Sequence, residues 1–183
     1  MKLKNSFYIF LFTFLSLFSS QIGLGQGVFS FGDTDSIETA NNLLIEAQVL
    51  DGGKPFEGVN VGVKANDEVL LLSATNEKGF FKIELNFDTL FVLEFRKPGY
   101  ITKKIEIDTR NLPEEDKKYG YDLGLFKLSM LKRDEGDPSL YLDAIARFHY
   151  SDVAQIFVVD KVFKKEIKKR FEEKDVKPDV IKF

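Results

Sequence analysis

The chain has 183 residues, of which 44% are hydrophobic and 14% aromatic, and its formal net charge is -3. This apolar content is enough for a packed core and excludes a disordered chain. The acidic balance argues against a nucleic-acid-binding protein. The absence of cysteine excludes disulfides, thiolate catalysis, cysteine-ligated zinc and a lipoprotein anchor.

The N-terminus has the pattern of an export signal. Two lysines precede an uncharged apolar run at residues 7–18, and Gly23 and Gly25 place small residues where a signal peptidase cuts. We therefore predict a signal peptide over residues 1–25 and an exported protein, in the periplasm or associated with the outer membrane. An uncleaved anchor is the alternative, but about a dozen apolar residues fall short of the ~20 that a spanning helix needs.

Strands are expected from residue 43 onward, after a flexible linker at residues 26–42 that is rich in Gly, Ser, Asn and Asp. In the first strand, alternation places Leu43, Ile45, Ala47 and Val49 on the core side. Further strands are predicted at residues 59–63, 69–74, 80–85, 90–95, 101–107 and 119–128. Seven strands without an intervening helix predict a β-sandwich over residues 43–130.

Three landmarks in this region appear in a fixed order. They are Pro-Phe-Glu-Gly-Val-Asn-Val at residues 55–61, Thr-Asn-Glu-Lys-Gly at residues 75–79 and Lys-Pro-Gly-Tyr at residues 97–100. The ordered set resembles the carboxypeptidase regulatory-like domain, with Asn76 where that family usually has Asp. The resemblance covers residues 43–108. It implies a seven-stranded, transthyretin-like sandwich that accompanies metallocarboxypeptidase domains, outer-membrane receptors and envelope assembly proteins, and it implies no catalytic residue.

Residues 131–183 are predicted to form a C-terminal extension that resembles no family. A charged, turn-prone linker at residues 132–138 precedes a hairpin of residues 145–150 and 156–159. Asp160 is placed to cap a helix over residues 161–174. Within that helix one apolar stripe recurs at every fourth position, formed by Phe163, Ile167 and Phe171. We expect the stripe to dock on the sandwich or on a partner.

No catalytic, cofactor-binding or metal-binding residue is predicted. His149 is the only histidine, so the two histidines of a metallocarboxypeptidase zinc site are missing, and a structural or exposed role is favoured. Asp134, Glu135 and Asp137 surround Gly136, but their spacing matches no EF-hand and favours a solvated linker over a calcium loop.

Two surfaces are predicted as partner contacts. The strand at residues 101–107 alternates apolar and charged side chains, and we expect it to offer an exposed edge for strand addition, with Tyr100 at its start. The helix is basic and amphipathic, so a peripheral membrane contact is an alternative to docking with a solvated basic face. The predicted partner-binding residues are Tyr100, Ile101, Lys103, Ile105, Phe163, Ile167 and Phe171.

The function expected from these features is that of a non-enzymatic, exported binding module. It would act through protein–protein contacts as an accessory or assembly subunit of an outer-membrane or envelope complex. A carbohydrate- or peptidoglycan-binding module is the alternative, with Tyr100, Tyr119 and Tyr121 as stacking residues, although the absence of Trp weakens it. A hydrolase is disfavoured, because one histidine and no cysteine leave no recognisable catalytic set.

Overall fold

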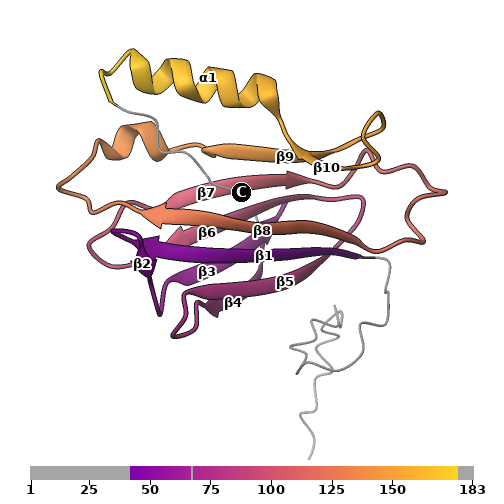
Figure 1. Cartoon of the computed structure of the whole chain (residues 1–183), viewed down its shortest axis with the longest axis horizontal. Coiled ribbons are helices and arrows are strands. Elements are labelled where there is room, and N and C mark those ends of the chain that lie inside the picture. The colour runs from indigo at the N-terminus through magenta and orange to yellow at the C-terminus, as the bar shows by residue number, and fades with distance from the viewer. Residues whose placement is uncertain (1–41, 67, 177–183) are drawn as a thin grey trace, which may run out of the picture. The chain divides into compact units, whose positions relative to one another are not determined.

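A computed structural model of the protein describes residues 42–66 and 68–176. These residues form two β-sheets that face one another, with an α-helix beside the strand β9 (Figure 1). The predicted signal peptide and the linker up to residue 41 lie outside the described residues, as do residues 177–183. No helix of the described part is long and apolar enough to cross a membrane.

The first sheet is built around β1, which has a neighbour on each side. Its strands are β1 (Asn42–Asp51), β2 (Lys54–Pro55), β5 (Phe80–Asn86) and β8 (Tyr121–Met130). β5 and the short β2 pair antiparallel with β1, whereas β8 pairs with it in parallel. The first strand of the sandwich is therefore a central strand of this sheet.

The second sheet has the order β10-β9-β7-β6-β3-β4. Its strands are β3 (Asn60–Ala65), β4 (Glu68–Ala74), β6 (Leu90–Arg96), β7 (Lys103–Asp108), β9 (Ala146–Ser151) and β10 (Ile156–Val159). β9 pairs in parallel with β7, and all other neighbours are antiparallel. The predicted C-terminal hairpin is thus β9 and β10, and it extends this sheet.

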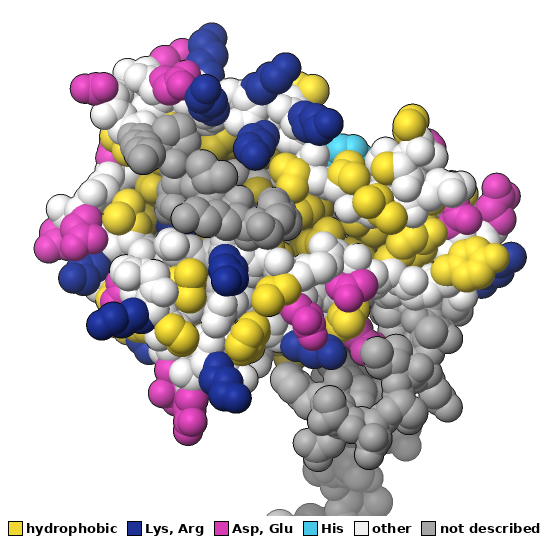
Figure 2. Space-filling view, viewed as in Figure 1, with side chains coloured by type: hydrophobic (Ala, Val, Ile, Leu, Met, Phe, Trp, Pro, Cys, Tyr) yellow, Lys and Arg dark blue, Asp and Glu magenta, His cyan; other side chains and the backbone are white. Residues whose placement is uncertain are grey.

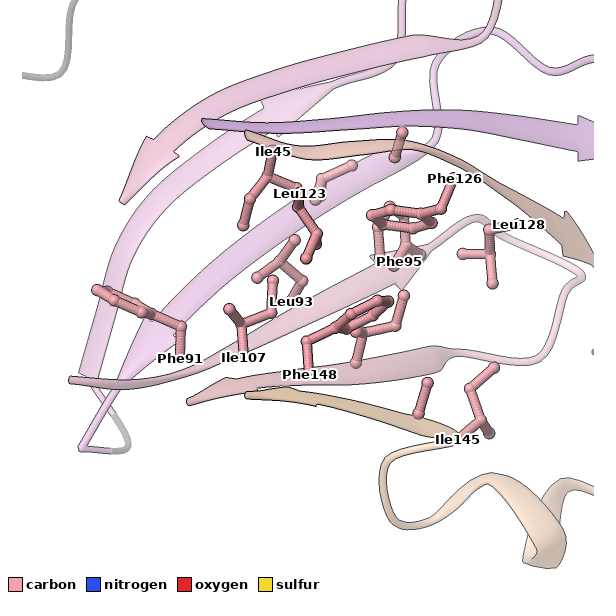
Figure 3. Packing of buried hydrophobic residues seen from close by; sticks show 14 of the residues in the cluster. Ile45, Phe91, Leu93, Phe95, Ile107, Leu123, Phe126, Leu128, Ile145 and Phe148 are labelled. Atoms are coloured by element: carbon pink, nitrogen blue, oxygen red, sulfur yellow. The ribbon is translucent and has the colours of Figure 1, made fainter. Parts of the chain in front are cut away.

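The core lies between the two sheets. The four residues predicted to face inward from β1, Leu43, Ile45, Ala47 and Val49, are all fully buried. Figure 3 shows Ile45, Leu123 and Phe126 of the first sheet opposite Leu93, Ile107 and Phe148 of the second. Across this layer the rings of Phe126 and Phe148 lie 5.9 Å apart. The all-β sandwich expected from the sequence is confirmed, with seven principal strands before the C-terminal hairpin and helix.

A β-bulge changes which side chains of β8 face the core. The pairing of β1 with β8 shifts register near Gly124, which has a φ of +77°. The Gly124 N–H donates a 2.7 Å hydrogen bond to the Asp122 carboxylate, which holds the glycine in this conformation. Leu123 and Phe126 are buried on either side of the extra residue, and Leu125 is exposed. The bulge therefore turns one leucine of an apolar strand toward solvent.

The remaining elements follow the sandwich. A short 3-10 helix, η1 (Pro138–Tyr141), was not expected from the sequence, and Asp137 caps it. The one α-helix found in residues 42–66 and 68–176, α1, spans Lys161–Glu172 and is slightly shorter than predicted. Its predicted N-cap is confirmed, because the Asp160 carboxylate accepts hydrogen bonds from the N–H groups of Val162 and Phe163 at 2.9 and 3.0 Å.

Candidate partner-binding surface

β7 does not have the free edge that the sequence suggested. It is hydrogen-bonded to β6 on one side and to β9 on the other, and the N–H of Ile101 just before it donates to the Leu131 carbonyl at 2.8 Å. Ile101, Lys103 and Ile105 are buried. The expectation of strand addition at residues 101–107 is therefore wrong, because residues from the C-terminal extension already occupy that edge.

Tyr100, the fourth residue predicted on this strand, is held at a turn. Its ring packs on Phe56 with 4.9 Å between centroids, and its hydroxyl donates to the Asp51 carboxylate at 2.8 Å. This hydrogen bond is the main reason why the pKa of Tyr100 is raised. These contacts make Tyr100 a link between two turns of its own chain.

The three sequence landmarks meet at this end of the sandwich. The Thr75 hydroxyl donates to the Phe56 carbonyl at 2.6 Å and accepts from the Val59 N–H at 3.0 Å. The Lys97 ammonium donates to the carbonyls of Glu57 and Gly58 at 2.8 and 2.9 Å. The three landmarks therefore hold one another in position, and their shared role is structural.

Gly79 shows why the middle landmark ends in glycine. It has a φ of +74°, which side chains rarely adopt, and an added Cβ would lie 2.5 Å from the Val49 carbonyl oxygen and 2.9 Å from the Phe56 nitrogen. The turn begins at Asn76, whose side-chain oxygen accepts from the N–H groups of Lys78 and Phe80. An asparagine oxygen makes the same contacts as an aspartate oxygen would, so either residue at position 76 keeps the turn.

β4 is the exposed edge strand that sequence reasoning missed. It ends the second sheet, with β3 as its only neighbouring strand among the described residues. Three of its large apolar side chains are open to solvent, since Val69, Leu70 and Leu72 are 52%, 40% and 74% exposed. Free backbone groups beside exposed leucines form a template for another strand.

The sequence of β4 lacks the features that usually protect an edge. Glu68 is its only charged residue, and it contains no lysine and no proline. Leu72 lies opposite Gly62 on β3, where the missing side chain leaves Leu72 uncovered. The sequence shows the apolar run of β4 and the glycine of the preceding strand, which together could have indicated an exposed apolar surface. It does not show that β4 lies at the edge of the sheet.

A second apolar surface lies where the two sheets meet. β10 ends the second sheet and lies beside β8 of the first, and Ile156 and Leu125 are exposed on these strands. Figure 2 shows hydrophobic side chains gathered over β10 and the nearby part of β8. The rings of Tyr121, Tyr150 and Phe157 pack against one another beneath them, 5.6 to 5.7 Å apart. The cluster closes this side of the core.

The apolar stripe of α1 is used within the chain. Ile167 and Phe171 are buried, and the ring of Phe171 stands edge-on to Tyr141 at 5.3 Å. Phe163 is half-buried beneath the guanidinium of Arg147, 4.4 Å from the ring centre. Of the two expectations for this stripe, docking on its own sandwich is the one observed. Phe163, Ile167 and Phe171 are therefore not available as partner contacts in this structure.

A groove of about 280 Å³ lies on the outer face of the second sheet. Its charged lining residues are Lys64, Glu94, Lys104, Glu106 and Asp143. They are already engaged, with Lys64 on Glu94 at 3.1 Å, Glu106 on Arg147 at 2.6 Å and Asp143 on Arg170 at 3.1 Å. Lys104 donates to the Leu142 carbonyl at 2.6 Å. The groove is polar, but its charges are satisfied by the chain itself.

Lys103 is a buried titratable group that the sequence analysis placed at a partner surface. Its ammonium donates to the Ser129 carbonyl and lies 5.5 Å from the centre of the Tyr141 ring. Burial lowers the pKa of Lys103 to about 7 and raises that of Tyr141. The sequence did indicate that Lys103 is buried, because it lies on the same face of the strand as the buried Ile105 and Ile107.

The other sequence candidates are dispersed. His149 lies on β9, opposite Val158 of β10 and Asp108 of β7, and is half-buried. Asp137 caps η1 and lies 3.7 Å from the Lys174 ammonium. Among the described residues no group of three histidine or acidic side chains could hold a metal ion. Tyr121 is half-buried in the aromatic cluster, whereas Tyr119 is exposed, and Tyr100 belongs to the landmark turns.

Comparison with known proteins adds little beyond the fold. No family model and no curated protein matches the chain. Among solved structures it is similar to a 3-chlorocatechol 1,2-dioxygenase from Rhodococcus opacus 1CP, with 13% identity, a TM-score of 0.37 and coverage of 57% of this chain and 64% of that chain, which is less than two thirds of its length. It is also similar to the 5-hydroxyisourate hydrolase of Klebsiella pneumoniae, with 20% identity, a TM-score of 0.34 and coverage of 52% and 91%.

At TM-scores below 0.5 these two structures carry no argument about fold or activity. The fold class therefore rests on the strand pairing of the chain itself.

Proposed function

We propose that the protein is a non-enzymatic, exported binding module that accepts a strand from a partner in the cell envelope. The observation that carries this proposal is the edge strand β4, with three exposed large hydrophobic residues and one charge. The partner contact predicted for residues 101–107 is thereby replaced by one at Glu68–Ala74. The ordered landmarks add the resemblance to the carboxypeptidase regulatory-like domain, which accompanies envelope receptors and assembly proteins.

The partner expected at β4 is an extended segment of another protein with apolar side chains at alternate positions. Main-chain hydrogen bonds would supply affinity, and contacts with Val69 and Leu72 would supply selectivity. These two side chains share the outer face of the sheet, because they lie opposite Lys64 and Gly62 of β3. A partner strand would therefore cover them from the side and extend the second sheet by one strand.

The test uses the protein purified from envelope extracts and a photo-crosslinking residue at position 72. We expect one envelope protein to be captured, to crosslink at position 72 and to slow hydrogen exchange in the β4 amides. Leu72→Lys should weaken capture by at least about tenfold, because a charge at a buried contact opposes strand addition. The matched control is Val153→Lys, at a loop residue that is 99% exposed, and it should leave capture unchanged.

Three outcomes would contradict the proposal. Capture without crosslinking at position 72 would place the contact elsewhere, and capture of nothing but a second copy of the chain would replace the envelope partner by self-association. Equal losses in Leu72→Lys and Val153→Lys would show that added charge alone weakens capture. Thermal unfolding of both variants is measured in parallel, so that loss of folding is separated from loss of the contact.

A further inference from the structure

The helix α1 concentrates positive charge in a chain that is acidic as a whole. Residues 161–174 contain seven basic and three acidic side chains, a net charge of +4, whereas the whole chain has a net charge of -3. Figure 2 shows these lysine and arginine side chains along the helix. The charge is therefore separated in space, with a basic surface on one element.

The lysines near the start of the helix are the unbalanced part. Four basic residues in its second half or just beyond it have acidic neighbours: Lys168 with Glu172, Lys169 with Glu173, Arg170 with Asp143 and Lys174 with Asp137, at 3.1 to 3.7 Å. Lys161, Lys164 and Lys165 are exposed and form no ion pair with any residue in the described ranges. They form the N-terminal lysine face of α1.

This face is electrostatically unfavourable in the isolated protein. The N-terminus of a helix carries partial positive charge, so lysines in its first turns repel it and one another. No acidic residue lies in the first turn, and the nearest acidic side chains of the helix are the Asp160 cap and Glu166, which follows Lys165. An external negative charge would remove this repulsion, which is why an anionic ligand fits here.

An anionic lipid surface fits the face better than a protein does. Protein interfaces are depleted in lysine and built around an apolar centre. The lysine face has no such centre, because Ile167 and Phe171 point into the chain and Val162 is the only exposed hydrophobic residue of the helix. Lysine binds phosphate as a mobile point charge without a fixed geometry, as a fluid layer of headgroups requires.

We propose that Lys161, Lys164 and Lys165 bind the protein to an anionic phospholipid surface by electrostatic attraction alone. The buried stripe excludes the insertion of Phe163, Ile167 and Phe171 that an interfacial helix would need. A helix of 12 residues is about 18 Å long and places its first two turns against the headgroups while β4 stays free. The contact is independent of strand addition at β4.

The test measures co-sedimentation of the protein, as cells produce it, with vesicles of phosphatidylcholine alone or mixed with phosphatidylglycerol. The reading is the increase in binding caused by the anionic lipid, so that any contribution of residues 1–25 cancels. We expect the increase to disappear at high salt, because exposed charges are screened. The triple variant Lys161→Gln, Lys164→Gln, Lys165→Gln should lose about a hundredfold in affinity, the product of three lysine contributions.

The control is the triple variant Lys54→Gln, Lys78→Gln, Lys127→Gln, which removes the same charge from exposed lysines of the sandwich. It should bind as the parent chain does. Equal losses in both triple variants, or binding that survives high salt, would overturn the proposal. Equally tight binding to a soluble polyanion such as heparin would also overturn it, since the face would then recognise charge without a membrane.

Discussion

Lys103 is a charged residue placed in the core of an acidic sandwich. It is fully buried, with its ammonium near the Ser129 carbonyl and the Tyr141 ring. Desolvation disfavours the charged form, and the pKa falls from 10.5 to about 7. Tyr141 lies beside it and packs in turn on Phe171, so this residue couples β7 to the elements of the C-terminal extension. Its protonation should therefore be visible in the stability of the whole domain.

We predict that the free energy of unfolding rises with pH between about pH 7 and pH 10. In this window the unfolded chain keeps the lysine proton and the native state has lost it, so raising the pH favours the native state by up to about 1.4 kcal/mol per unit. Below pH 7 both states are protonated and the full penalty remains. Above about pH 10 tyrosines with raised pKa values, such as Tyr141, act in the opposite direction.

Urea unfolding at several pH values measures this slope. Lys103→Met should flatten it, because the titrating group is gone, while the exposed Lys127→Met should leave it as in the parent chain. A parent chain whose stability is constant or falls across the window would show that Lys103 keeps its ordinary pKa.

At the scale of elements, α1 is part of the folded unit rather than an arm. Phe171 is buried against Tyr141, and the Phe171 carbonyl accepts a hydrogen bond from the Val176 N–H at 3.0 Å. We predict that Phe171→Ala lowers the free energy of unfolding by about 3 to 5 kcal/mol, the usual cost of removing a buried aromatic ring. Val162→Ala on the exposed face should change it by less than about 0.5 kcal/mol.

Chemical denaturation, followed separately by near-ultraviolet and far-ultraviolet circular dichroism, distinguishes a helix docked on the sandwich from a helix that is an independent arm. One shared transition that shifts in Phe171→Ala and not in Val162→Ala supports a docked helix. If Phe171→Ala loses only helical signal and the sandwich unfolds at its original midpoint, the helix is an independent arm.

Periodicity in the sequence identified strands and their inward faces, but not their neighbours. The alternation of Ile105 and Ile107 marks one face of β7, and that face is buried in the structure, but the same alternation occurs in edge and central strands, so Ile105 was wrongly placed at a partner contact. The partner that covers β7 is β9, about forty residues later, and a parallel pairing over that distance leaves no local pattern. For the same reason the free edge of β4 could not be predicted from its apolar residues.

At the scale of the molecule, the division into a sandwich and an extension does not separate two cores. The hairpin adds Phe148, Tyr150 and Phe157 to the same buried cluster that contains β1 and β6. Two parallel pairings, β1 with β8 and β7 with β9, join strands that are far apart in the sequence. The landmarks and the local turns were predictable, whereas closure of the core by residues 131–176 depends on these distant contacts.

We predict that a chain ending at Met130 does not fold. It would lose the buried side chains of Phe148, Tyr150, Phe157, Ile167 and Phe171. At about 1.5 to 3 kcal/mol for each large side chain, the loss of about 7.5 to 15 kcal/mol is as large as the roughly 5 to 15 kcal/mol by which a domain is stable. The edge of β7 would also be exposed, which favours aggregation.

The measurement is cooperative thermal unfolding of the shortened chain, with residues 131–183 supplied as a separate chain for complementation. We expect no transition from the shortened chain alone and recovery of one when the two pieces are coexpressed, because the missing β9 can then pair with β7. A shortened chain that melts cooperatively by itself would mean that residues 43–130 hold a complete core, and the extension would then be free to leave the sandwich and to dock on a partner through Ile167 and Phe171.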